Sequence, residues 1–475
     1  MALTTGIENL TPTPSKGQLF QKNYISDFDF ANQFLPDVYE KQAEIYGNRS
    51  ISSFLRLVSA EMPSASDEIR WVEQGRLHIT YDNVALNVAT GVFTVTFANL
   101  PDGASAGTSQ APAVRVGQTI MVQEKDGTGP VLKGVVTVAG ANASSTTGTF
   151  TAHCYEAATW AKTGFTAATG VRVLVYGSEF AKGSNGMADS IESDYMSYTN
   201  KPIILKDNYQ INGSDTAQIG WIEVTSENGA SGYLWYLQSE HETRQRFEDY
   251  LEMSMVEAVK KAGTVHASFP TNVTGSEGLF AALESRGNVF ENLSTDTDLS
   301  DFDTILKQLD KNGAIEENMI YANRALSLSI DDGLAAKNSY GSGGTSYGVF
   351  NNSEDMALNL GFAGFRRGSY DFYKTDWKYL NDHATRGGFT DIEGAIIPAG
   401  TSTVYDQDLG KNIKRPFLHV RYRASETDDR KMKTWITGSV GGAYTSDVDE
   451  MRVNFLSERC LITQGANNFF LLKKA

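Results

Sequence analysis

The sequence has few cysteines and no long hydrophobic run. Its 475 residues include two cysteines, Cys154 and Cys460, which lie far apart. Two isolated thiols form neither a disulfide framework nor a metal-binding cluster, so we expect both to be reduced and buried. No run reaches the roughly 18 apolar residues that a bilayer-spanning helix needs. The first residues lack the basic and apolar regions of a secretory signal. We therefore expect no membrane association.

Basic residues are scarce relative to acidic ones. The chain has 41 Lys and Arg against 57 Asp and Glu, which gives a formal net charge of −16. A surface that grips nucleic-acid phosphates needs the opposite balance, so this charge argues against a nucleic-acid-binding protein.

Patterns typical of catalytic or metal sites are absent. None of the six histidines has a partner at metal-binding spacing. The acidic run at 296–303 lacks the glycine and the closing glutamate of a calcium loop. The glycines at 341–344 lack the Lys-Ser/Thr of a phosphate loop, and no nucleophile elbow occurs. We therefore predict no catalytic, cofactor-binding or metal-binding residues, and a protein that is not an enzyme.

Aromatic residues are concentrated in residues 1–50, which otherwise show little periodicity. They include Phe20, Tyr24, Phe28 and Phe30. Because aromatic side chains bury a large area per residue, such an arm suits docking on a neighbouring chain. The alternative is a short helix at about 37–46 that packs on the chain's own core.

Short strand-like runs alternate with glycine and aspartate turns in residues 83–178. The expected strands are 91–97, 114–123, 131–138, 147–155 and 171–175. This spacing predicts a small β-barrel or sandwich. Extended stretches flank it, at 69–81 on one side and 197–209 on the other. We expect these stretches to pair as two limbs of a hairpin that carries the β domain at its tip.

The longest helical pattern covers residues 231–262, where apolar residues recur mostly three or four apart and Gly263 is a suitable stop. Residues 276–400 then alternate helices and strands, with helices expected from Ser300 to Gly313 and at 324–336. A buried strand is expected at 319–322. This alternation predicts a sheet flanked by helices.

Residues 401–475 read mostly as strand. The segment 417–423 alternates Leu418, Val420 and Tyr422 with His419, Arg421 and Arg423, which predicts a sheet with one wet face. Near the end, two apolar runs at 453–456 and 469–472 are joined by a polar turn at 464–468.

This order of elements resembles the shared capsid fold of tailed bacteriophages and herpesviruses. The segments LSERCLITQGANNFFLLKK and LDKNGAIEENMIYANRAL are most similar to capsid proteins of crAss-like phages of Bacteroidales. The resemblance implies an α+β tailed-phage major capsid fold. Its parts would be an N-terminal arm (1–50), an extended hairpin loop (51–82 and 179–229), an inserted small β-barrel or sandwich domain (83–178), a spine-helix peripheral domain (230–275 and 401–475) and an axial α/β domain (276–400).

The resemblance also implies a function. A major capsid protein self-assembles into pentamers and hexamers of an icosahedral head in the virion, is assembled in the bacterial host cytoplasm, and encloses double-stranded DNA without sequence-specific binding. Its further partners would be portal, auxiliary or decoration, and scaffold proteins, and we expect non-covalent assembly. The acidic charge is compatible, because an acidic lining repels packaged DNA.

Expected inter-subunit contacts are aromatic residues of the arm, the hairpin and an axial loop: Phe20, Tyr24, Phe28, Phe30, Trp71, Tyr209, Tyr340 and Tyr347. Two alternatives stay open. One is another virion structural protein, from a tail or a decoration. The other is a hydrolytic or carbohydrate-active enzyme with an accessory β domain, which would need a pair of carboxylates in a pocket.

Overall fold

The computed structural model describes residues 61–474, with gaps at 76–77, 98–110, 128, 145–146, 168–169, 189, 192–194, 218–223, 226–230, 233–234, 292–298, 314, 338–363, 400, 407–410 and 443. The chain divides into two compact units. Among the described residues, the first unit comprises Asp207–Phe247 and Thr434–Phe455, and the second comprises the rest.

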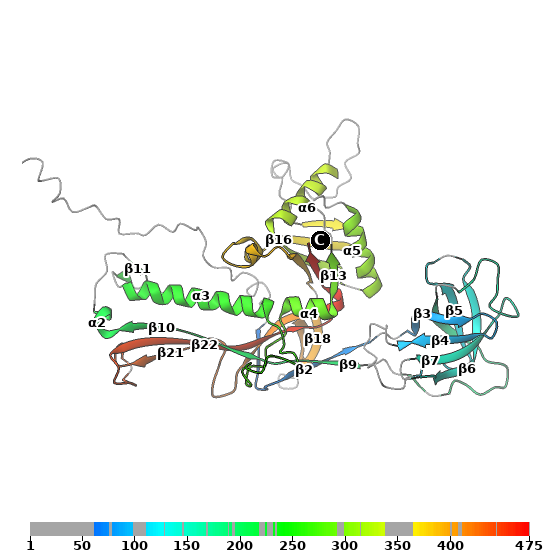
Figure 1. Cartoon of the computed structure of the whole chain (residues 1–475), viewed down its shortest axis with the longest axis horizontal. Coiled ribbons are helices and arrows are strands. Elements are labelled where there is room, and N and C mark those ends of the chain that lie inside the picture. The colour runs from blue at the N-terminus through cyan, green and yellow to red at the C-terminus, as the bar shows by residue number, and fades with distance from the viewer. Residues whose placement is uncertain are drawn as a thin grey trace, which may run out of the picture. The chain divides into compact units, whose positions relative to one another are not determined.

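A mixed six-stranded sheet is the centre of the second unit (Figure 1). Its strand order is β13-β23-β17-β14-β16-β15. The strands are β13 (Asn288–Glu291), β14 (Glu317–Ala322), β15 (Gly364–Arg367), β16 (Tyr370–Asp376), β17 (Ile392–Pro398) and β23 (Phe470–Lys473). β13 pairs parallel with β23, and β14 pairs parallel with β16, while the other neighbours are antiparallel.

Both faces of this sheet are covered, because successive side chains of a strand point to opposite faces. Ile396 of β17 packs into one apolar cluster with α5 (Leu299–Asn312) and α6 (Arg324–Lys337). Its neighbours Ala395 and Ile397 pack into another with α4 (Leu279–Arg286) and α7 (Lys378–Asn381). The predicted sheet flanked by helices is therefore confirmed.

Helix α5 shows how the sequence sets one of these contacts. Phe302, Ile305 and Leu309 fall three and four residues apart, and all three are buried against the sheet. Each fully buried side chain of this size contributes roughly 1.5–3 kcal/mol. Gly313 ends the helix with a φ of +62°, a conformation that glycine adopts without strain.

A second sheet has five strands in the order β1-β20-β22-β10, with β21 also paired to β22. These are β1 (Glu61–Ser64), β10 (Ile203–Asn212), β20 (Leu418–Arg423), β21 (Lys433–Gly438) and β22 (Glu450–Thr463). β1 runs parallel to β20, and β20 runs antiparallel to β22. The long helix is α3 (Trp235–Glu257), which ends before the predicted stop at Gly263.

A two-stranded ribbon joins this core to the inserted domain along the chain. β2 (Ile69–Gln74) pairs antiparallel with β9 (Tyr195–Asn200), which confirms the pairing of the two predicted limbs over these residues. The second limb ends at Asn200 and not at 209, because β10 belongs to the five-stranded sheet. The expected single strand at 69–81 is wrong, because the chain leaves the ribbon after Gln74 and begins β3 at Thr80.

The inserted domain is a closed antiparallel barrel with the strand order β3-β4-β7-β6-β5-β8 (Figure 1). Its strands are β3 (Thr80–Asn87), β4 (Val92–Thr96), β5 (Gln118–Glu124), β6 (Leu132–Asn142), β7 (Thr147–Cys154) and β8 (Val171–Ser178). Phe93 and Phe150 stack at 4.8 Å between ring centroids, and Trp160 meets Phe93 edge-on at 5.3 Å. The barrel thus has its own aromatic core, as a small β domain requires.

The remaining elements are short. They are α2 (Gly213–Thr216), β11 (Val224–Thr225), β12 (Ser231–Gly232), β18 (Thr401–Asp406), β19 (Lys411–Pro416) and the 3₁₀ turns η5 (Arg386–Gly388) and η6 (Ala466–Asn468). β11 pairs with β12, and β18 pairs with β19, each in a separate two-stranded sheet.

The last segment contributes to two sheets, and one prediction for it needs correction. β23 belongs to the six-stranded sheet, whereas β22 belongs to the five-stranded one. His419 is also buried, together with Leu418 and Val420, so β20 has no fully wet face. Its Nδ1 lies 3.1 Å from the Pro416 carbonyl oxygen, which satisfies the buried ring.

Candidate assembly surfaces

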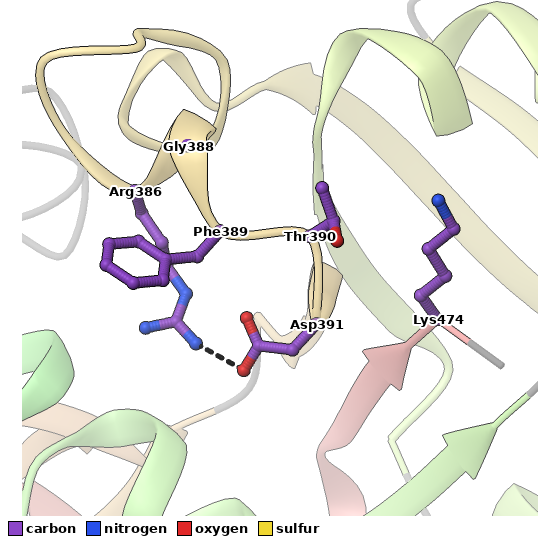
Figure 2. Close-up of a pocket in the computed structure, with 6 residues that line it drawn as sticks. All are labelled: Arg386, Gly388, Phe389, Thr390, Asp391 and Lys474. Atoms are coloured by element: carbon purple, nitrogen blue, oxygen red, sulfur yellow. Dashed lines mark hydrogen bonds and ion pairs between the residues drawn. The ribbon is translucent and has the colours of Figure 1, made fainter.

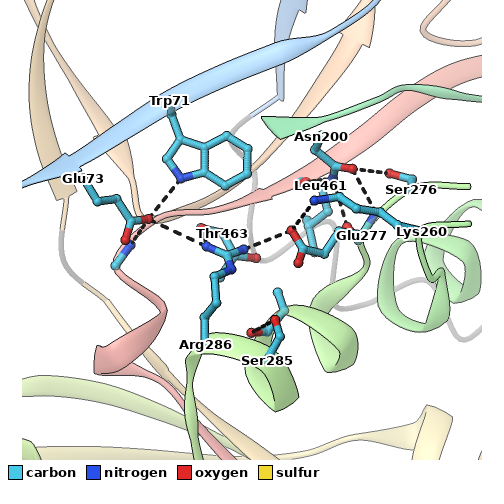
Figure 3. A network of polar contacts seen from close by, with 12 residues as sticks. Trp71, Glu73, Asn200, Lys260, Ser276, Glu277, Ser285, Arg286, Leu461 and Thr463 are labelled. Atoms are coloured by element: carbon cyan, nitrogen blue, oxygen red, sulfur yellow. Dashed lines mark hydrogen bonds and ion pairs between the residues drawn. The ribbon is translucent and has the colours of Figure 1, made fainter. Parts of the chain in front are cut away.

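Within the second unit, Arg286 of α4 fixes the β2–β9 ribbon to the core (Figure 3). Its guanidinium carbon lies 4.5 Å from the Tyr198 ring centroid and 5.6 Å from that of Trp71. The same guanidinium donates to Glu277 Oε2 at 3.0 Å and lies 3.9 Å from Glu73 Oε1. A half-enclosed cation that faces two rings and two carboxylates holds the ribbon in one orientation.

Glu73 of β2 ties the ribbon to the turn after β22. Its Oε1 accepts the Trp71 indole N–H at 3.0 Å and the Gly465 backbone N–H at 2.9 Å (Figure 3). One carboxylate oxygen therefore orients the indole and satisfies a turn amide at the same time. Such charge-assisted bonds are stronger than neutral ones.

Asn200, which pairs with Ile69 at the end of the ribbon away from the barrel, is 1% exposed and fully bonded. Its amide nitrogen donates to the carbonyl oxygens of Leu461 at 2.7 Å and Glu277 at 3.0 Å. Its amide oxygen accepts the Glu277 N–H at 2.9 Å, the Ser276 hydroxyl at 3.2 Å and the Lys201 N–H. A buried amide satisfied on both sides makes this end of the ribbon rigid.

The two faces of the ribbon differ. Trp71 and Tyr198 pack with Cys460 and Ile462 of β22. On the opposite face Val72 is 57% exposed and Tyr195 is 60% exposed. The ribbon therefore buries one face within the chain, while its other face, which also carries Arg70 and Ser197, exposes the apolar side chains of Val72 and Tyr195 to solvent.

Two of the eight predicted contact residues lie in the described part of the chain. Trp71 is 7% exposed, and the structure places its ring in the chain's own core, where little of it is open to a neighbour. Tyr209 is half-buried on β10, in the first unit. Burial raises its pKa, and a hydrogen bond with Ser239 partly offsets that rise. The other six fall outside the described residues: Phe20, Tyr24, Phe28, Phe30, Tyr340 and Tyr347.

A cavity of about 640 Å³ lies beside η5, and Figure 2 shows the residues that line it. Arg386 donates there to Asp391 Oδ2 at 2.7 Å and also to Glu257 Oε1 at 2.6 Å, which Tyr379 contacts as well. The guanidinium charge is thus compensated by two carboxylates, and Lys474 adds a second cationic side chain to the lining. Phe389, at the rim, is 70% exposed.

A further exposed apolar surface lies on the β21–β22 hairpin of the first unit. Trp435 is 37% exposed and Ile436 is 41% exposed, both on β21. In the turn between the strands, Tyr444 is 88% exposed and Val448 is 52% exposed. Trp435 and Ile436 are consecutive in the strand, so they lie on opposite faces of the hairpin, and each face exposes one large apolar side chain.

Catalytic chemistry finds little support among the described residues. Burial raises the pKa of the Cys460 thiol to about 12, which keeps it protonated and unreactive. In the described ranges, no group of three or more His, Cys, Asp or Glu side chains could hold a metal ion. None of the helices in the described part of the chain has the length and apolar content that crossing a membrane requires.

Sequence reasoning missed the polar residues that anchor the ribbon. Glu73, Asn200, Glu277 and Arg286 come from distant parts of the chain and form no motif. Their only local signal is the Asn200-Lys201-Pro202 corner, because proline restricts the residue before it and often marks the end of an extended segment.

No protein-family model and no curated protein sequence matches the chain. Among solved structures, it is similar to a chain of the capsid of cyanophage P-SCSP1u, with 11% identity, 64% of this chain and 81% of that chain covered, and a TM-score of 0.34. The mature capsid of bacteriophage PhiM1 is similar with 8% identity, 63% of this chain and 79% of that chain covered, and a TM-score of 0.34. Microbacterium phage Oxtober96 is similar with 8% identity, 95% of this chain and 100% of that chain covered, and a TM-score of 0.41.

Proposed function

We propose that the chain is the major capsid protein of a tailed phage, most similar to those of crAss-like phages. It self-assembles into pentamers and hexamers of an icosahedral head that encloses double-stranded DNA. The observation that carries this proposal is the two-faced ribbon. Its inner face is anchored by Arg286, and its outer face leaves Val72 and Tyr195 exposed.

An exposed ribbon of this kind is explained by association. The polar anchor at its base fixes its direction before any partner arrives, which lowers the ordering cost of binding. Contacts between different surfaces of identical chains close into rings when the rotation between copies allows it. The net charge of −16 suits a shell around DNA, because an acidic lining does not adhere to phosphate.

Further partners follow from the same proposal. The barrel, which has its own core, is suited to receive decoration proteins or to stabilise neighbouring subunits. Portal and scaffold proteins would set the site and the geometry of assembly in the host cytoplasm. The aromatic arm residues would add contacts between subunits.

The first test is the assembly of the purified chain at rising concentration, followed by sedimentation and negative-stain microscopy. Rings of five or six, or closed shells, are expected. A chain that stays monomeric at every concentration, also with portal and scaffold proteins added, would overturn the proposal. Rings alone, with no shell under any condition, would favour a tail component instead.

A paired substitution locates the contact. Val72→Asp places a charge on the outer face of the ribbon and is expected to abolish assembly while the unfolding temperature stays unchanged. Val273→Asp, at a residue that is 49% exposed in a loop, is the matched control and is expected to assemble normally. Equal assembly of both variants would show that the outer face of the ribbon makes no contact needed for assembly.

A further inference from the structure

β21 is an edge strand. It pairs with β22 on one side, and within the described residues no other strand pairs with it (Figure 1). An open edge offers backbone N–H and C=O groups to any second strand, so proteins usually protect edges with proline, charge or a bulge. The β21 sequence Lys-Thr-Trp-Ile-Thr-Gly contains no proline, and its one charge stands at the first position.

The residues of β21 are those that stabilise pairing. Trp435 and Ile436 are 37% and 41% exposed, and Thr434 is also exposed. Aromatic and β-branched residues favour strands and make favourable cross-strand pairs. The strand carries no acidic residue, although the chain as a whole has a net charge of −16. It is therefore a site where two such chains can meet without repulsion between carboxylates.

We propose that β21 pairs antiparallel with β21 of a second copy about a two-fold axis at Trp435. This rests on the proposed shell function and adds to it one specific contact between subunits. A two-fold axis between antiparallel strands is perpendicular to the sheet, so the residue on the axis faces its own copy. Trp435 then lies opposite the partner's Trp435, and Thr434 lies opposite the partner's Ile436.

This register is self-complementary. The central pair is aromatic on aromatic, and the pairs beside it are threonine on isoleucine, all favourable cross-strand combinations. Lys433 faces the partner's Thr437 and lies roughly 13 Å along the strands from the partner's Lys433, so their like charges stay apart. The contact is isologous, with one surface used twice.

Cysteine pairs test this register directly. Directly opposite residues have Cα atoms about 4.5–5.5 Å apart, which a disulfide can bridge, whereas a residue one step off the axis lies roughly 8 Å from its own copy. In a Cys154→Ser background, Thr434→Cys and Ile436→Cys are each expected to stay uncross-linked alone. A mixture of the two, oxidised at high concentration, is expected to form disulfide-linked dimers, and Trp435→Cys is expected to do so by itself.

The control is Val138→Cys in the same background, an exposed strand residue of the barrel that is expected to give no dimer in any mixture with the β21 variants. Dimers of Thr434→Cys alone, or equal cross-linking in every mixture, would overturn the register. Absence of dimers from both the mixture and Trp435→Cys would overturn the contact.

A charge substitution gives a second, independent reading. Trp435→Lys places two like charges at the axis and is expected to abolish the contact, whereas Trp435→Phe keeps an aromatic pair and is expected to retain it. Each Trp435 variant is combined with Thr434→Cys and, separately, with Ile436→Cys, and the yield of cross-linked dimer from the mixture is compared. The comparison requires that the two Trp435 variants unfold at the same temperature. Cross-linking that survives Trp435→Lys undiminished would overturn the proposal.

Assembly, scored separately, distinguishes the two proposals. Shells without the disulfide pattern would leave the proposed function standing and remove the β21 contact. The disulfide pattern without rings or shells would support the β21 contact and overturn the proposed function.

Discussion

The guanidinium of Arg286 lies over the Tyr198 ring, with 4.5 Å between Cζ and the ring centroid, and it also donates to Glu277. Arg286 of α4 thereby contacts β9 through a cation–π interaction and is itself held by an ion pair with Glu277. Since these groups lie far apart in the sequence, the ribbon is anchored by a tertiary contact and not by its own strand pairing.

Arg286→Ala should therefore loosen the ribbon and leave the barrel intact. We expect a loss of about 1–3 kcal/mol, because Glu277 and Glu73 lose a charged partner. Hydrogen exchange should rise in β2 and β9 and stay unchanged in the barrel strands. Arg366→Ala, at an arginine whose side chain is 64% exposed, is the control and should change neither measurement. Unchanged exchange in the ribbon of Arg286→Ala would contradict the anchor.

Two substitutions at Trp71 separate the contribution of ring packing to stability from that of the hydrogen bond to Glu73. Trp71→Phe keeps most of the buried ring but loses the bond to Glu73, so we expect a cost of about 1 kcal/mol. Trp71→Ala removes the ring and should cost about 3–5 kcal/mol. The measurement is urea unfolding monitored by circular dichroism. Similar costs for the two variants would mean that the indole N–H, and not the ring, is the main contribution.

Stability should fall at high pH through Tyr321. Burial, and then the charge of Glu252, raise the pKa of its phenol to about 12. The folded state therefore holds this proton more tightly than the unfolded chain, whose tyrosines titrate near 10. The contribution is fully present below about pH 10 and is lost as the pH rises toward 12, at most roughly 2–3 kcal/mol.

Tyr321→Phe is the control for that titration. The difference in unfolding free energy between the two proteins, measured at pH 9, 10 and 11, should shift in favour of the phenylalanine variant. A difference that is independent of pH would contradict the raised pKa.

The two thiols should react differently. Burial holds Cys460 protonated, with a pKa of about 12. Cys154 is only half-buried on the barrel, so the expectation that both thiols are buried is wrong for it. A thiol reagent at pH 8 should modify Cys154 in the folded chain and reach Cys460 only after unfolding. The Cys154→Ser variant should then show almost no reaction until denaturant is added. Rapid labelling of that variant in the folded state would place Cys460 outside a stable core.

The sequence predicted those elements whose residues carry their own period. Helix α5, with its stripe at Phe302, Ile305 and Leu309, and five of the six barrel strands were found in this way, whereas β3 was not expected. It failed where tertiary contacts decide. His419 alternates like a surface residue, yet the layers on both sides of β20 bury it, and nothing local places β23 in a different sheet from β22.

The candidate surfaces were harder to predict for the same reason. The expected contact of Trp71 with a neighbour rests on its aromatic ring and its extended segment. The sequence does not show that the ring packs with Cys460 and Ile462, almost 400 residues further along the chain. A strand sequence does not say which of its faces the rest of the chain will cover.

The topology of the barrel has a consequence for how the chain can change. Its first strand pairs with its last, Thr80 opposite Leu174 and Tyr81 opposite Val173, and the ribbon strands that lead to it are also paired, Gln74 opposite Tyr195. The chain therefore enters and leaves the barrel at neighbouring positions. A foreign domain with neighbouring termini can replace the barrel without altering the register of β2 against β9. This position is therefore suited to domain exchange, both in evolution and in engineered display of a foreign domain.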